Sequence, residues 1–326
     1  MVRNVFVTGA TGFVGRHLVD RLVAHGMQVR ALVRPTSDTA HLESAGVELV
    51  PGDLRDEKAI RRGVEGADIV YHLAAVTAAR TDREYASTNS DGTAALLAGI
   101  RLATVRPSRL VYLSSYAAVG PWDGRSPRAR GDPETPLTSY GRTKLEGERI
   151  VREAEKYGVE VLVIRSPAVF GPGDRALLPY FRLVRSGLAP VPGGDDRRLH
   201  LIYVKDLAEA LARAADSGQG TVSVADPRIH RWSDVVGTIA KVFGKSPVWI
   251  HLPQPLVRFA AAFTEWVGRV LGRAVPFNRE KAEEMLASGW VCDLSGSEAL
   301  LPATSVTPLE QGIDETIRWY IRQGWI

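Results

Sequence analysis

The sequence has almost no cysteine and no concentration of charge, and both absences exclude classes of protein. Its single cysteine, Cys292, excludes an internal disulfide framework and a metal site built from several cysteines. The 41 Lys and Arg residues against 37 Asp and Glu residues give a net charge of +4, without a block of like charge. We therefore expect no nucleic-acid partner.

The sequence also lacks a long uninterrupted apolar run. The N-terminus, MVRNVFVTGA, begins a predicted strand and shows no secretion signal, so together with the lone cysteine it favours a cytoplasmic location. The most apolar late stretch (255–272) is interrupted by Arg258, Glu265 and Arg269, and we predict no transmembrane segment. We interpret it as an amphipathic helix packed on the core, the alternative being a lid that touches an apolar substrate or a membrane surface.

Apolar strand-like runs alternate with helical patterns through the first half of the chain. The predicted strands cover 2–9, 28–34, 47–53, 67–75, 109–115 and 159–167. The predicted helices begin after the first strand and then cover 56–63, 83–105 and 140–157. This alternation predicts an α/β fold, a Rossmann-type doubly wound parallel sheet covered on both faces.

The regular alternation fades after Pro167, where glycine and proline punctuate the chain. A strand and helix pattern returns near 201, and TVSVAD at 221–226 reads as another strand. We therefore predict a Rossmann domain over 1–170, to which 201–226 returns. A smaller, partly helical substrate-binding domain would consist of 171–200 and 227–326.

A glycine triplet stands where the first strand meets the first helix. In TGATGFVG (8–15), Gly9 suits a tight turn, Gly12 a close approach to a pyrophosphate, and Gly15 close packing of the helix on the sheet. The following helix N-terminus offers free N–H groups and a partial positive charge to phosphates. This position between strand and helix predicts a dinucleotide site.

The second predicted strand ends in LVRPTSD, where the ribose of a dinucleotide is usually read. Arg34, with Thr36 and Ser37 close by, favours a 2′-phosphate and therefore NADP over NAD. The alternative is that Asp38 binds the ribose, in which case Arg34 would be a solvated charge at the end of the strand. Asp53, after the third strand, is suited to bond the adenine amine.

Tyr140 and Lys144 stand four residues apart in SYGRTK (139–144), which places them on one face of a helix. A lysine ammonium one turn away, together with a positive nicotinamide ring, would favour the tyrosine phenolate, because an opposite charge lowers the pKa. Lys144 could also hold the nicotinamide ribose. Ser115, at the end of the predicted strand 109–115, could polarise a substrate oxygen. Ser114 is the alternative one residue earlier.

Taken together, ordered motifs over roughly 1–250 resemble the extended short-chain dehydrogenases/reductases. They are TGATGFVG (8–15), HLAA (72–75), NSDGT (89–93), SS (114–115), YGRTK (140–144) and RSPAVFGPGD (165–174). The resemblance implies catalytic roles for Ser115, Tyr140 and Lys144 and a supporting role for Asn89. It also implies cofactor contacts from Gly9, Thr11, Gly12, Phe13, Val14, Gly15, Arg34, Asp53, Leu54, Leu73, Ala74, Ala75, Tyr140, Lys144, Pro167 and Ala168.

Departures from subfamily patterns narrow the expected reaction. Sugar dehydratases carry Thr-Asp-Glu where this chain has Ser-Tyr-Ala from Ser115, and nucleotide-sugar epimerases usually carry asparagine at Ala168 and arginine near Leu199. VRALVRPTSD and RSPAVFGPGD are similar to dihydroflavonol-reductase-like and 3β-hydroxysteroid-dehydrogenase-like members. We expect an NADP-dependent oxidoreductase acting on an apolar ketone or secondary alcohol. The alternatives are an NAD-dependent nucleotide-sugar epimerase and a non-catalytic dinucleotide sensor.

Several further features have two interpretations. Arg125, Arg128 and Arg130 (within 121–134) could clamp an anion but are more typical of a solvated loop. His200 and His251 lack neighbours at metal-ligand spacing, so we interpret them as structural or surface residues and predict no metal. A homodimer could form through the helices that hold Asn89 and Tyr140, with LLAGIRLA (96–103) as the apolar face.

Overall fold

The architecture comes from a computed structural model, which describes residues 2–124, 126–129, 131–194, 197–275 and 277–326. Among these residues, a seven-stranded sheet has the order β11-β6-β5-β4-β1-β2-β3, and every neighbouring pair is parallel. Its strands are β1 (Asn4–Thr8), β2 (Gln28–Val33), β3 (Glu48–Pro51), β4 (Ile69–His72), β5 (Arg109–Ser115), β6 (Glu160–Ser166) and β11 (Gly220–Ser223). The predicted doubly wound parallel sheet is confirmed.

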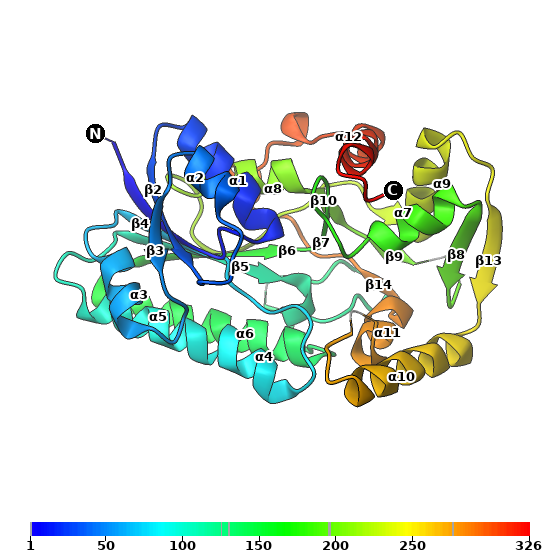
Figure 1. Cartoon of the computed structure of the whole chain (residues 1–326), viewed down its shortest axis with the longest axis horizontal. Coiled ribbons are helices and arrows are strands. Elements are labelled where there is room, and N and C mark those ends of the chain that lie inside the picture. The colour runs from blue at the N-terminus through cyan, green and yellow to red at the C-terminus, as the bar shows by residue number, and fades with distance from the viewer. Residues whose placement is uncertain (1, 125, 130, 195–196, 276) are drawn as a thin grey trace.

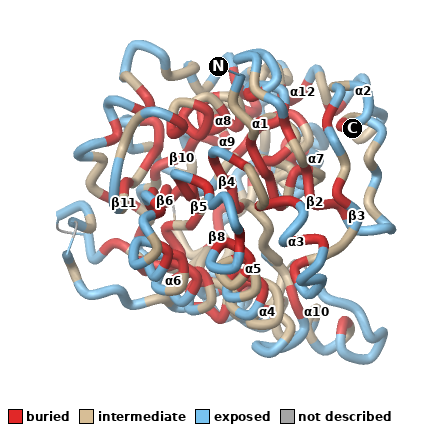
Figure 2. The backbone as a smooth tube through the Cα atoms, turned by 90° about the vertical axis from the view of Figure 1, so that its left-hand side faces the viewer, coloured by how far each residue is buried: buried red, intermediate tan, exposed pale blue. Residues whose placement is uncertain are grey.

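Helices cover both faces of this sheet (Figure 1). One face carries α1 (Phe13–Ala24), α2 (Ala40–Ser44) and α8 (Val204–Arg213), and the other carries α3 (Glu57–Val64), α4 (Asp82–Asn89), α5 (Asp91–Leu102) and α6 (Ser139–Arg152). Alternation along β1 explains the two layers, since Val5 and Val7 join the core under α1 while Phe6 joins the core under α3 and α5. Buried positions follow the sheet in Figure 2.

Two helices in the structure differ in extent from the helices predicted from the sequence. The stretch predicted as one helix over 83–105 is split at Ser90 into α4 and α5. The Thr93 hydroxyl donates to the Asn89 carbonyl oxygen at 2.6 Å, which is a local hydrogen bond of the kind that bends helices. The stretch over 140–157 is α-helical to Arg152, and a 3₁₀ turn then carries it to Tyr157.

The remaining described residues build smaller sheets and helices beside the main sheet. The strands are β7 (Ala168–Phe170) paired with β10 (Leu201–Tyr203), β8 (Leu188–Pro192) paired with β13 (Val248–Leu252), and β9 (Arg198–Leu199) between β12 (His230–Arg231) and β14 (Gly289–Trp290). The helices are α7 (Leu178–Arg185), α9 (Trp232–Val242), α10 (Gln254–Val270), α11 (Arg279–Leu286) and α12 (Leu309–Arg322). Since β11 pairs with β6, part of the predicted returning segment lies in the main sheet. The division into two domains stays a prediction.

The junction of β1 and α1 leaves no room for side chains at two glycines. Gly9 has φ +80°, and a Cβ there would lie 2.6 Å from the Ala74 nitrogen. A Cβ on Gly15 would lie 2.1 Å from the Gly9 carbonyl oxygen, because α1 begins directly against the end of the strand. The tight turn and the close packing predicted from the sequence are therefore both present.

Gly15→Ala should destabilise the protein strongly, because the added methyl group meets backbone that cannot rotate away. We expect a loss of at least about 1–3 kcal/mol in the free energy of unfolding, measured by urea denaturation. Gly237→Ala is the matched control, since open space surrounds Gly237 in α9. That control should be neutral or slightly stabilising. Equal stability of the two variants would contradict the packing described here.

Candidate active site

The strand order places two groups of predicted site residues at one crevice. The sheet order reverses between β1 and β4, and ligands of doubly wound sheets bind outside the carboxyl ends of the strands at such a point. The glycine loop follows β1, and Leu73, Ala74 and Ala75 follow β4. Ser115 ends β5 at the same edge. The topology therefore gathers residues predicted from distant parts of the sequence.

The structure brings Ser115, Tyr140 and Lys144 together. Tyr140 lies in the first turn of α6, which begins there because the Thr138 hydroxyl oxygen accepts from the Gly141 N–H at 3.1 Å. Its phenol shares a hydrogen bond with the Ser115 side chain. One turn later, Lys144 Nζ donates to the Leu113 carbonyl oxygen at 2.6 Å. The buried lysine thus reaches β5 beneath the tyrosine–serine pair.

Burial holds the proton on Tyr140. Burial raises the pKa of Tyr140 to about 12, and the Glu284 carboxylate adds to this, although the Ser115 hydrogen bond opposes it. Burial lowers the pKa of Lys144 to about 7, with the Glu148 carboxylate opposing the shift. The expectation that Lys144 and a positive nicotinamide ring together favour the Tyr140 phenolate stays a prediction, since burial is the largest influence on this pKa in the protein alone. At neutral pH Tyr140 is a phenol ready to donate.

Ser114 and Ser115 face different surroundings, which separates the two candidates. Ser114 is buried and donates to Glu148 Oε1 at 2.6 Å. Arg165 binds both oxygens of that carboxylate, at 2.9 and 2.7 Å. Ser114 therefore belongs to a buried ionic cluster, and Ser115 is the serine that meets Tyr140.

Asn89 is buried and acts through its neighbours. Its Oδ1 accepts from the Val76 N–H at 2.8 Å, and its Nδ2 donates to the Val76 carbonyl oxygen at 3.1 Å and to Thr143 Oγ1 at 3.0 Å. These contacts fasten the loop after β4 to α6 between Tyr140 and Lys144. The geometry suits the supporting role predicted from the resemblance.

His72 is a residue to which the sequence reasoning gave no role. It is fully buried at the end of β4, where Nδ1 lies 2.6 Å from Thr8 Oγ1 and Nε2 lies 2.8 Å from Thr93 Oγ1. Because the Thr93 hydroxyl already donates to the Asn89 carbonyl oxygen, Nε2 must carry the proton and Nδ1 must accept from Thr8. A histidine ending the apolar strand IVYH was the signal available in the sequence.

The remaining predicted cofactor residues follow the carboxyl ends of strands in the main sheet. Gly12 is exposed at the start of α1, a helix without a side-chain cap. The Leu73 N–H donates to the Thr8 carbonyl oxygen at 3.1 Å and fixes the small residues that follow. Pro167 is buried, and Ala168 is exposed at the start of β7. Thr11 precedes α1, Phe13 and Val14 begin it, and Leu54 is buried against the position of Gly92.

Arg34 and its competitor Asp38 are both exposed, but Asp38 already has a cationic partner. Arg16 Nη2 donates to Asp38 Oδ2 at 3.0 Å and holds the pKa of that carboxyl below its usual value. Arg16 Nε also donates to the Thr11 carbonyl oxygen at 3.2 Å. The sequence reasoning missed Arg16, which is a second arginine near the predicted ribose-binding residues.

Asp53 lies in a turn after β3. Its carboxylate accepts from the Arg55 backbone N–H and from Arg55 Nη2, each at 2.8 Å. These bonds hold the pKa of Asp53 below its usual value. Its bond to an adenine amine stays a prediction.

Other residues singled out from the sequence lie elsewhere. Burial lowers the pKa of His200 to about 4, which fits a structural histidine, and His251 is exposed on β13. Arg128 folds back on its own loop and donates to the Val119 carbonyl oxygen at 2.8 Å. Arg125 and Arg130 lie outside the described residues. Within the described part of the chain, no group of three or more His, Cys, Asp or Glu residues could hold a metal ion.

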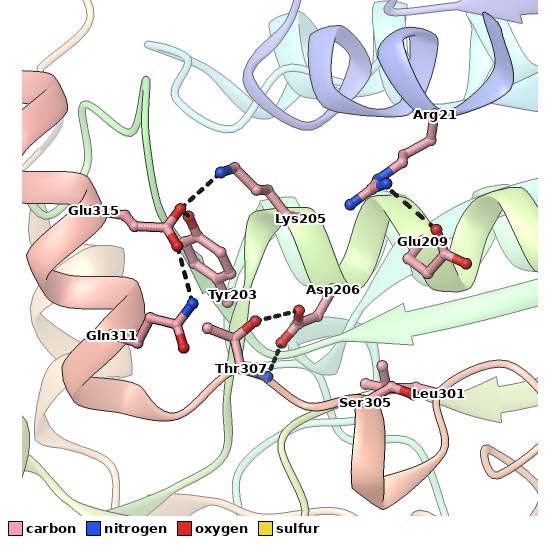
Figure 3. Close-up of a pocket in the computed structure, with 10 residues that line it drawn as sticks. All are labelled: Arg21, Tyr203, Lys205, Asp206, Glu209, Leu301, Ser305, Thr307, Gln311 and Glu315. Carbon is pink, nitrogen blue, oxygen red and sulfur yellow. Dashed lines mark hydrogen bonds and ion pairs between the residues drawn. The ribbon is translucent and has the colours of Figure 1, made fainter. Parts of the chain in front are cut away.

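A charged pocket of about 450 Å³ lies between α1, α8 and α12 (Figure 3). Its polar groups bond to one another, since Lys205 Nζ and the Tyr203 hydroxyl both donate to Glu315 Oε2 at 2.7 Å. This pocket is on the α1 and α8 side of the sheet, whereas Tyr140 starts α6 on the other side. It is therefore separate from the candidate active site.

Comparison with known families agrees with this geometry. The family described as "NAD dependent epimerase/dehydratase family" matches residues 5–225. The chain belongs to this family, the extended short-chain dehydrogenases/reductases. As a member it is an NAD(P)-dependent enzyme, as the motifs indicated.

Two relatives and one solved structure are similar to this extended short-chain dehydrogenase/reductase over nearly its whole length. It is 32% identical to "Ceramide reductase" of Caulobacter vibrioides, over 99% of this chain and 96% of that protein. It is 30% identical to "Putative dihydroflavonol 4-reductase" of Synechocystis, over 98% and 95%. The crystal structure of gox2253 is 23% identical and covers 99% of both chains, with a TM-score of 0.81, and this likeness shows the fold alone.

The buried His72 should make the protein's stability depend on acid pH. Burial lowers its pKa from 6.5 to about 3, so below about pH 6.5 the unfolded chain binds a proton that the folded chain refuses. The free energy of unfolding should therefore fall, by up to about 1.4 kcal/mol per pH unit, as pH drops from about 6 to about 4.

Urea unfolding of the wild type and of His72→Gln across this pH range measures the effect as a difference in slope. The glutamine variant lacks the titrating group and should show the shallower dependence. His251→Gln removes an exposed imidazole as the control. Parallel slopes for the wild type and His72→Gln would show that His72 is protonated in the fold.

Proposed function

We propose that this enzyme is an NADP-dependent ketoreductase that reduces an apolar ketone to a secondary alcohol. The observation that carries the proposal is the hydrogen-bonded pair of Ser115 and Tyr140, with Lys144 one turn away, at the crevice beside the glycine loop. The Tyr140 pKa of about 12 means that a proton is available at neutral pH for a developing alkoxide. The reduced dinucleotide, when bound, supplies the hydride.

The crevice fits a dinucleotide. The first turn of α1 has no side-chain cap, so its N–H groups are free to donate to phosphate oxygens. Gly12 is exposed in that turn. Ala74 and Ala75, which follow β4, have small side chains and so allow a dinucleotide to lie close to them. In this arrangement Ser115 orients the substrate oxygen, Tyr140 donates the proton, and Lys144 holds the ribose and supports the α6–β5 contact.

The proposal of NADP rests on two arginines, Arg16 and Arg34, near the predicted ribose-binding residues. Asp38 would repel a 2′-phosphate, but its charge is offset by Arg16. Arg34 then adds a cation at the end of β2, where the ribose is usually read. Together the three side chains carry one net positive charge, which favours a phosphate over a free hydroxyl.

The substrate class follows from what the crevice lacks and from the relatives. Ala168 stands where nucleotide-sugar epimerases usually carry asparagine, so one group that holds a substrate diphosphate is missing; Leu199 replaces the usual arginine, although Arg197 and Arg198 precede it. A relative that aligns over nearly the whole chain is named for reducing ceramide, which is a lipid. We therefore favour an apolar ketone over a sugar nucleotide. The assembled Ser115, Tyr140 and Lys144 count against the non-catalytic sensor.

Tyr140→Phe should lower NADPH-dependent ketone reduction by at least about 100-fold, because the proton donor is lost while the ring stays in place. Binding of NADPH, measured by calorimetry, should change little. Tyr157→Phe, in the turn that follows the same helix, is the control and should keep full activity. Activity of Tyr140→Phe close to that of the control would remove Tyr140 from the mechanism.

Arg34→Glu should weaken NADPH binding by at least about tenfold, because a charge-assisted hydrogen bond to the 2′-phosphate becomes a repulsion. Binding of NADH should be unchanged or stronger. Lys245→Glu makes the same change of charge at an exposed position after α9 and should affect neither dinucleotide. A parallel loss of NADPH and NADH binding in Arg34→Glu would contradict its role as the phosphate reader.

A further inference from the structure

Helix α10 turns its largest apolar side chains away from the protein. The spacing 256, 259, 263, 266 and 270 places five of them in one stripe along the helix. Their exposed fractions are 50% for Leu256, 70% for Phe259, 55% for Phe263, 60% for Trp266 and 67% for Val270. A contiguous apolar patch of this kind on a protein surface marks an interaction site.

Smaller residues make the contact between α10 and the protein. Val257, Ala261 and Gly268 are its buried residues, and α10 packs mainly on α11. Both views place α10 at the edge of the molecule (Figures 1 and 2). The interpretation as a core-packed helix therefore holds only for this narrow side, and the aromatic side is uncovered.

The side chains beside the stripe carry a small net positive charge. Residues 254–273 contain three arginines, Arg258, Arg269 and Arg273, against one acidic residue, Glu265. Arg269 pairs with Glu265 and Arg258 pairs with Glu283 of α11, so the net charge comes from Arg273. Arg273 is exposed directly after the helix. An anionic surface would complement this combination of apolar stripe and basic border.

We propose that α10 docks on an anionic lipid bilayer, lying in the plane of the membrane with its stripe at the boundary of headgroups and acyl chains. Aromatic and leucine side chains on one face with arginines beside them are typical of helices at this boundary. Among the described residues, no helix is long and apolar enough to span a bilayer.

Hydrogen bonds connect the candidate active site to α11, on which α10 packs, and to the residues that follow α10. The Ser139 N–H donates to Glu280 Oε1 at 2.7 Å, and the Thr138 hydroxyl donates to Glu284 Oε1 at 3.2 Å, both from the start of α6 to α11. Arg80, in the loop after β4, donates to the Gly272 carbonyl oxygen at 3.3 Å. Docking would therefore hold the entrance beside Tyr140 close to the membrane in which an apolar ketone dissolves. This last step rests on the proposed function.

Flotation of the full chain with vesicles tests the docking without any assay of activity. The wild type should float with phosphatidylcholine vesicles that contain phosphatidylglycerol, less with pure phosphatidylcholine, and less at high salt. The triple variant Phe259→Ser, Phe263→Ser and Trp266→Ser should bind at least about tenfold more weakly. Its folding should be intact, because the three side chains are exposed. The control replaces Leu102, Val105 and Ile321, which are equally exposed apolar residues elsewhere, by serine.

Two results would overturn the docking proposal. Equal vesicle binding by the wild type and the triple variant would show that the stripe is not the contact. Absence of vesicle binding, with a dimer that the triple variant abolishes, would assign the stripe to a second copy.

Activity separates this proposal from the proposed function. The triple variant should retain reduction of a short, water-soluble ketone and lose reduction of a long-chain ketone presented in vesicles. A wild type that floats but reduces no ketone would contradict the ketoreductase and leave the docking in place.

Discussion

A neutral histidine buried between two strands and a helix fixes the geometry of the whole crevice. His72 accepts from Thr8 at the end of β1 and donates to Thr93 on α5, which in turn bonds the Asn89 carbonyl. The Asn89 side chain then holds the loop after β4 against α6. The glycine loop, the wall of the crevice and the catalytic helix are therefore linked by one chain of buried hydrogen bonds. The ring must stay neutral for this chain to persist, because a buried charge there would have no counter-ion among these partners.

The sequence predicted those features that depend on local pattern. Strand positions, the turn at Gly9 and the pairing of Tyr140 with Lys144 follow from hydrophobic period and helix geometry, and the structure agrees with them. It did not predict the partners of polar groups across the fold. Arg16 lies 22 residues from Asp38 in sequence, and Glu284 lies far from Tyr140, so only the folded chain shows which charges meet. For α10 the sequence left both a core-packed helix and a contact with an apolar substrate or membrane open, since periodicity does not tell which face is buried.

Burial supports the proposed reduction. Desolvation raises the pKa of Tyr140 and lowers that of Lys144, so the uncharged forms of both gain relative to water. A neutral phenol held by Ser115 can give up its proton as an alkoxide forms, which corresponds to reduction. Oxidation would need a further positive charge beside the phenol. The electrostatics of the protein and the predicted choice of NADP thus point to the same reaction.

The central claim is net hydride transfer from a dissociable NADPH to a ketone, and a labelled dinucleotide tests it most directly. The enzyme would be supplied with NADPH carrying deuterium at its transferable position and with a series of long-chain ketones, and the product alcohols would be examined by mass spectrometry. The account predicts one deuterium on the carbinol carbon of the product, with equal consumption of NADPH. Inversion of a sugar nucleotide by a dinucleotide that stays bound, without consumption of NADPH, would contradict it.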